Sequence, residues 1–104
     1  MKTENADRKE EKAHLEWDKR VPEVVKSLPE GERKRVVSAI LSLADDPTPP
    51  RSRPLPGRPG WRRLDEGAFC ILYTLKVTSR GLVVTVYAVL KDGKLLAPEL
   101  YRMD

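Results

Sequence analysis

Hydrophobic residues follow two different spacings, one in the first half of the chain and another in the second. Between residues 21 and 44 apolar positions recur every three or four residues, which is typical of helices that bury one face. The expected stripe of the first helix consists of Val21, Val24, Val25 and Leu28, and that of the second of Val36, Val37, Ile40, Leu41 and Ala44, with Leu43 flanking it.

Polar residues and prolines mark the ends of these two helices. Asp18 offers a side-chain cap before the first helix. Pro29 ends that helix, because the residue before a proline avoids helical backbone, and it can also open the second. We interpret Asp45-Asp46-Pro47 as the stop signal of the second helix rather than as a catalytic carboxylate pair. The short link predicts an antiparallel helical hairpin.

Longer apolar runs in the second half predict strands, because central strands covered by helices are apolar at nearly every position. The expected strands are residues 13–17 (at a sheet edge), 61–64, 69–77 and 82–90, and the expected turns are residues 65–67, 78–81 and 91–94. The two-residue period of a strand then gives two faces. Phe69, Ile71, Tyr73 and Leu75 are expected to face the helices, and Cys70, Leu72, Thr74 and Lys76 to face away.

The chain of 104 residues has material for one domain with one modest core. We expect a charged N-terminal extension over residues 1–12 and a single domain over residues 13–104. Residues 48–60 are too rich in proline for a regular element, and residues 95–104 are expected to form a helical turn over the sheet edge or to be mobile. The predicted fold is α+β, with a helical hairpin packed on a twisted, mainly antiparallel sheet of about four strands.

Positive charge is concentrated in one part of the chain. The formal net charge is +4, and residues 47–64 contain five arginines and no acidic residue. A cluster of one sign creates a local field whose common natural target is phosphate. The alternative is a solvated loop that happens to be rich in arginine.

The scarcity of cysteine and histidine excludes several kinds of site. One cysteine and one histidine cannot form an internal disulfide, a thiolate-clustered metal site or a histidine-based metal site. We therefore expect no metal and no small-molecule cofactor. No apolar run has the length of a membrane span, and the charged N-terminus does not match a secretory signal, so we expect a cytoplasmic protein without a membrane partner.

The succession of these features resembles the RelE/ParE toxin superfamily over roughly residues 15–91. The matching order is a Trp-Asp pair, the two helices with Leu-Pro between them, an Asp-Pro stop, a basic loop and two apolar strands. Leu55-Pro56-Gly57 resembles the Leu-x-Gly that precedes the family's second strand. Ala68 to Tyr73 (AFCILY) is similar to the family's Gly-Tyr-Arg-Ile-x-Tyr strand, and Arg62 lies where the family often has a basic residue after an aromatic one.

The resemblance implies the toxin of a bacterial type II toxin–antitoxin system, silenced by a cognate antitoxin. One branch arrests growth and translation by cutting mRNA in the ribosome without a metal, through attack of the 2′-hydroxyl on the adjacent phosphate. Another branch poisons DNA gyrase and is no nuclease. A degenerate, non-toxic member that only binds partners is the third possibility. The first branch is our leading expectation.

The same resemblance implies the site residues. The expected catalytic set is Arg62, Arg63, Lys91 and Tyr101, and the expected nucleic-acid-binding set is Arg51, Arg53, Arg58, Arg62, Arg63 and Lys94. The set is atypical, because Cys70, Leu64 and Asp92 stand where RNA-cutting members carry basic residues.

Three further residues have a structural and a functional interpretation. We expect Cys70 to be an inert, partly covered thiol rather than a nucleophile, since no histidine is placed to activate it. Tyr73 is expected in the core, with its hydroxyl at an edge, rather than as a proton donor. Trp61 is expected to pack on the sheet edge, with stacking on a base as its alternative.

Overall fold

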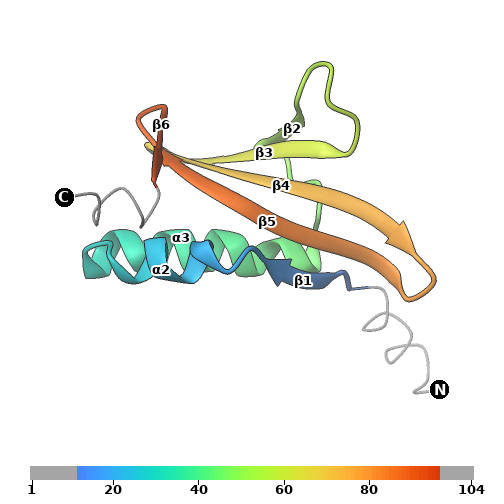
Figure 1. Cartoon of the computed structure of the whole chain (residues 1–104), viewed down its shortest axis with the longest axis horizontal. Helices are drawn as coiled ribbons and strands as arrows, with labels where there is room; N and C mark the ends of the chain where they lie inside the picture. Colours follow the sequence, from blue (N-terminus) through green and yellow to red (C-terminus); the bar gives the residue numbers. More distant parts are fainter. Residues whose placement is uncertain (1–11, 97–104) are drawn as a thin grey trace.

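The computed structural model describes residues 12–96 and has two helices packed on one face of a single sheet (Figure 1). The elements are β1 (His14–Trp17), α2 (Arg20–Lys26), α3 (Glu30–Asp45), β2 (Ser52–Pro54), β3 (Trp61–Glu66), β4 (Phe69–Thr78), β5 (Gly81–Lys91) and β6 (Lys94–Leu96). The strand order is β1-β5-β4-β3-β2, and β6 pairs with β5. Only β1 and β5 pair in parallel; the other neighbours are antiparallel. The predicted α+β class is confirmed, with six strands instead of about four.

The additional strands correct two expectations. Ser52–Pro54 lies in the segment expected to be irregular, yet it pairs with β3 as an edge strand. A proline is tolerated there because its missing N–H need not face a neighbouring strand. Lys94–Leu96 pairs with the end of β5, where a turn followed by a helical turn or a mobile segment was expected. The rest of that terminal segment, residues 97–104, lies outside the described residues.

The hairpin between β3 and β4 is tighter than expected. Asp65 and Glu66 continue β3 and pair with Cys70 and Phe69, instead of forming a turn. The connection is therefore only two residues long. Gly67 adopts φ 61°, a left-handed conformation that glycine reaches without steric cost. This extension places the carboxylate of Asp65 within the sheet.

The apolar stripe of the first helix is confirmed, and that of the second is rotated. Val21, Val24, Val25 and Leu28 are all buried. In α3 the buried residues are Val36, Ala39, Ile40 and Leu43. Leu41, which was expected in the stripe, is 51% exposed. The expected cap also differs in detail, because Asp18 accepts a hydrogen bond from the Arg20 backbone at 2.9 Å but lies one residue before the N-cap, Lys19.

The core lies between α2, α3 and one face of the sheet. Phe69, Ile71 and Tyr73 are buried there, as predicted, and Leu75 packs at its margin. The remaining fully covered residues of the sheet are Leu64 on β3 and Val84, Val86 and Val89 on β5.

A β-bulge interrupts the regular alternation of β5. Tyr73 pairs with Val86, but Leu72 pairs with Ala88, so Tyr87 is the extra residue. Val86 and Val89 are consequently both buried, although they are three positions apart. Bulges change the direction of a side chain near functional surfaces. Here the bulge turns the Tyr87 side chain away from the core.

The hydroxyl of Tyr73 joins three separate segments. The tyrosine is fully buried, and its hydroxyl donates a hydrogen bond of 2.6 Å to the carbonyl of Pro47, just after α3. It also accepts a hydrogen bond from Nε of Arg62 on β3, at 3.3 Å. The predicted core position, with the hydroxyl at an edge, is thus confirmed.

We predict that Tyr73→Phe destabilises the fold, because it leaves the Pro47 carbonyl without its donor. The expected loss in the free energy of unfolding is about 1–3 kcal/mol. Urea titration followed by circular dichroism measures it. Tyr87→Phe makes the same chemical change on a side chain that is 37% exposed, and it should lie close to wild type. Equal losses for the two variants would contradict this role of the Tyr73 hydroxyl.

Candidate nucleic-acid interface

The residues of β3 alternate between the two faces of the sheet. Leu64 pairs with Ile71, and both are buried against the helices, so Arg62 also points to the helix side. Trp61, Arg63 and Asp65 point the other way. We call this other side the open face; its residues on β3, β4 and β5 include Trp61, Arg63, Asp65, Cys70, Leu72, Thr74 and Tyr87. Within residues 12–96 neither helix covers it (Figure 1).

Arg62 occupies a structural position on the helix side of the sheet. Its Nη2 donates to the Ser52 hydroxyl at 2.8 Å, and its Nε donates to the Tyr73 hydroxyl. The guanidinium therefore connects β2, β3 and β4 beneath the sheet. This placement separates Arg62 from its neighbour Arg63, and the catalytic role expected for Arg62 stays a prediction.

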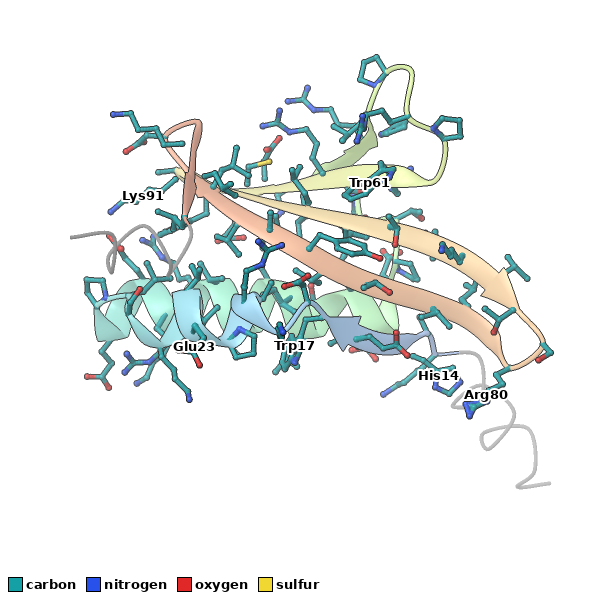
Figure 2. All side chains as sticks on the ribbon, in the orientation of Figure 1. His14, Trp17, Glu23, Trp61, Arg80 and Lys91 are labelled. Atoms are coloured by element: carbon teal, nitrogen blue, oxygen red, sulfur yellow. The ribbon has the colours of Figure 1, made fainter. Side chains whose placement is uncertain are left out.

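Lys91 also lies on the helix side, at the end of the sheet opposite the β4–β5 turn that carries Arg80 (Figure 2). Its ammonium is 3.1 Å from a carboxylate oxygen of Glu32 on α3 and 5.7 Å from the centre of the Phe69 ring. Lys94 is exposed on β6. Tyr101 lies outside the described residues. The structure thus does not bring Arg63 and Lys91 together, and their predicted roles stay untested.

On and beside the open face, the basic residues meet acids that follow them in the sequence. Nη2 and Nε of Arg63 are 2.7 and 3.1 Å from one oxygen of Asp65, and Nη2 of Arg53 is 3.2 Å from the other. This hydrogen bonding raises the pKa of Arg63. Arg51 forms a 2.6 Å ion pair with Glu66. The arginine cluster is therefore partly neutralised by the far end of β3.

These ion pairs leave the arginines available to a phosphate. The side chains of Arg53 and Arg63 are 65% and 38% exposed, and that of Asp65 is 35% exposed. Ion pairs at such positions contribute only about 0–1 kcal/mol. A phosphate accepting two hydrogen bonds from a guanidinium can compete with an interaction of that size. The acids therefore tune the positive field without removing it.

Cys70 lies on the open face between β3 and β5 and is only 8% exposed. Burial raises the pKa of its thiol; Arg63 lowers it by a smaller effect, and Asp65 raises it again. The thiol is therefore neutral at physiological pH. This agrees with the inert role expected for Cys70, since the thiolate is the nucleophilic form.

Trp61 and Tyr87 form an aromatic pair on the open face, with ring centroids 5.0 Å apart and planes inclined by 37°. Arg58, from the proline-rich loop, lies 5.6 Å above the Trp61 ring. The part played by Tyr87 was not foreseen from the sequence, because the β-bulge that redirects it has no marker within the predominantly apolar run of β5.

Other kinds of site are not found in the described part of the chain. Residues 12–96 contain no group of three or more metal-ligating side chains. Neither α2 nor α3 has the length and hydrophobicity of a membrane-spanning helix. A cavity of about 80 Å³ between α2, β5 and β6 is lined mainly by apolar residues such as Val21, Val24 and Leu96, and it contains none of the predicted site residues.

Comparison with known proteins finds similarity to solved structures only, since no protein-family model and no curated sequence matches. The archaeal RelE–RelB complex from Pyrococcus horikoshii OT3 has a chain that is 20% identical with a TM-score of 0.66, covering 79% of this chain and 97% of that one. A mutant of the E. coli toxin RelE in the free state is 20% identical with a TM-score of 0.61, covering 88% and 92%. The E. coli RelE mutant in complex with an antitoxin RelBc peptide is 23% identical with a TM-score of 0.58, covering 86% and 90%. The chain therefore has the RelE fold, as the resemblance in its sequence predicted.

We predict that alkylation of Cys70 by iodoacetamide has a pH midpoint above 9.0, the ordinary value for this thiol, because burial favours the protonated form. The pH midpoint reports the pKa of the thiol, whereas the rate of alkylation also depends on steric access to the sulfur. The same protein in urea is the control and should titrate at the ordinary value. With one cysteine in the chain, mass spectrometry reads the reaction without ambiguity. A native midpoint below that of the unfolded chain would contradict the assignment of a neutral thiol.

Proposed function

We propose that this chain is the toxin of a bacterial type II toxin–antitoxin system and acts as a RelE-like, ribosome-dependent mRNA endoribonuclease. The observation that carries the proposal is the RelE fold combined with an open face on which Arg63 is exposed. The flanking Arg53 and Arg58 support the proposal, because proteins bind single-stranded RNA partly through contacts between basic side chains and its phosphates.

The chemistry we propose needs no bound metal. The RNA 2′-hydroxyl gives its proton to water as its oxygen forms a bond to the adjacent phosphorus. The bond between this phosphorus and the 5′-oxygen breaks, and the leaving 5′-oxygen takes up a proton from water. The charge that develops on the phosphate is stabilised by Arg63, whose guanidinium presents several N–H donors on the open face. Arg62 takes part indirectly, by holding β2 and β3 in register from the helix side. The protein thus contributes orientation and electrostatic stabilisation.

We propose a cognate antitoxin as the partner that silences this activity. The similarity to chains in RelE–RelB complexes, among them the archaeal complex, supports this proposal. The ribosome and its mRNA are the proposed targets.

A gyrase poison without nuclease activity is the second candidate. Two observations favour it: Asp65 engages both Arg53 and Arg63, and Cys70 is a neutral thiol where RNA-cutting members of the superfamily carry arginine. Such a poison would need no catalytic set. A non-toxic member of the superfamily that only binds partners would share both features. Its expression would not arrest growth, which distinguishes it from a gyrase poison.

We predict that induced expression arrests growth and cuts ribosome-bound mRNA at codon boundaries, measured by mapping 5′ ends. Arg63→Gln should reduce cleavage by about 10²–10³-fold, the usual effect of removing one donor to a developing oxyanion. Arg80→Gln removes an equal charge at the exposed β4–β5 turn and serves as the control. Gyrase-linked DNA breaks with intact mRNA would replace the proposal by the second candidate, and harmless expression would exclude both.

We also predict that Asp65→Asn strengthens binding of single-stranded RNA, because it releases Arg53 and Arg63 from their ion pairs. One additional phosphate contact steepens the plot of log affinity against log salt by about 0.7. Asp92→Asn makes the same change of charge in the exposed β5–β6 turn. Equal effects of the two variants would mean that net charge, not the arginines beside Asp65, controls binding.

A further inference from the structure

The rings of Trp61 and Tyr87 meet above the middle strand of the sheet. Trp61 is on β3 and Tyr87 on β5, and both strands border β4 from opposite sides. Neighbouring strands are about 4.8 Å apart, so the two backbones lie roughly twice that distance from each other. Ring centroids only 5.0 Å apart therefore require both side chains to lean over β4. They do so on the open face, because Arg62, the neighbour of Trp61 on β3, points to the helix side.

Thr74 lies on β4 between these two strands, opposite Trp61 on one side and Thr85 on the other. It is only 5% exposed, although it faces away from the helices, and the aromatic pair is placed to cover it. Its hydroxyl has no hydrogen-bond partner. A buried polar group without a partner is uncommon, because desolvation is then not compensated. A hydroxyl this covered is out of reach of a ligand on the outer surface of the rings, so Thr74 belongs to the floor on which the aromatic pair packs.

The surroundings of the aromatic pair are basic. Arg58 lies over the Trp61 ring, and Arg63 follows two residues along β3 on the same face. Tyr87 is 37% exposed and Trp61 is half-buried, so part of the aromatic surface remains open to a ligand. A flat π surface and nearby guanidinium groups are features that bind a base and its phosphate in single-stranded nucleic acid.

We propose that Trp61 and Tyr87 form a stacking site for one nucleobase of single-stranded RNA, with Arg58 available to a neighbouring phosphate. The proposal rests on the proposed function, since it assumes that RNA reaches the open face. It assigns the aromatic pair to positioning the RNA, while Arg63 acts on the phosphate. An apolar side chain of a protein partner would use the rings but not the Arg58 guanidinium.

The test uses the fluorescence of Trp61 in the full chain carrying Trp17→Phe, which leaves Trp61 as the only tryptophan. The probe is a single-stranded 2′-O-methyl hexanucleotide, which cannot undergo 2′-hydroxyl attack. Stacking should quench the emission, and the same hexanucleotide without bases should not. Tyr87→Ala in this background should weaken binding by about 5- to 150-fold, the range for loss of one stacked base. Tyr87→Phe retains the ring and should bind nearly as tightly as the background chain.

Thermal unfolding of each variant shows whether it is folded, and only folded variants are compared. Absence of quenching, quenching by the baseless strand, or equal binding by Tyr87→Ala and Tyr87→Phe would each overturn the stacking site. Ribosomal mRNA cleavage by the wild-type chain is measured separately. Cleavage without quenching would reject the stacking site and leave the proposed function standing, whereas quenching without cleavage would reject the nuclease and retain the site.

Discussion

The fold depends on the hydroxyl of Tyr73, a polar group at the edge of the apolar core. Because it is fully buried, it must be hydrogen-bonded, and its partners are the carbonyl that follows α3 and the guanidinium of Arg62. The end of the helical hairpin is thereby tied to β3 and, through Ser52, to β2. The proline-rich loop between β2 and β3 carries Arg58, and these anchors set where that loop begins and ends.

Because of these contacts, the adjacent residues Arg62 and Arg63 have different roles. Arg62 is held by neutral oxygen atoms beneath the sheet, while Arg63 meets a carboxylate on the open face. The ion pair with Asp65 is weak enough to exchange for a phosphate, whereas loss of the Arg62 contacts would remove one of the two hydrogen bonds of the buried Tyr73 hydroxyl. The Trp61–Tyr87 pair lies on the same face as Arg63. Phosphate and base contacts are thus offered side by side.

Much of the fold followed from periodicity, because the helix and strand spacings of residues 21–44 and 69–90 are set by burial against one common core. The rotation of α3, which exposes Leu41 and buries Leu43, did not follow from periodicity. Both leucines fit a helical period, and only packing against the sheet determines which of them is buried. The site was less predictable. Strand pairing decides that Arg62 points inward and that Asp65 reaches Arg53, and a β-bulge decides where Tyr87 points. These are contacts between distant segments, which local sequence patterns do not encode.

The central claim is that the open face, and not the helix side, receives the ligand. Nitrogen-15 NMR of the arginine Nε–H groups during titration with a single-stranded hexanucleotide tests it most directly. The account predicts that the Arg63 signal shifts progressively, while the Arg62 signal, hydrogen-bonded to Tyr73, stays in place and exchanges slowly with solvent. A shift of Arg62 with Arg63 unchanged would contradict it.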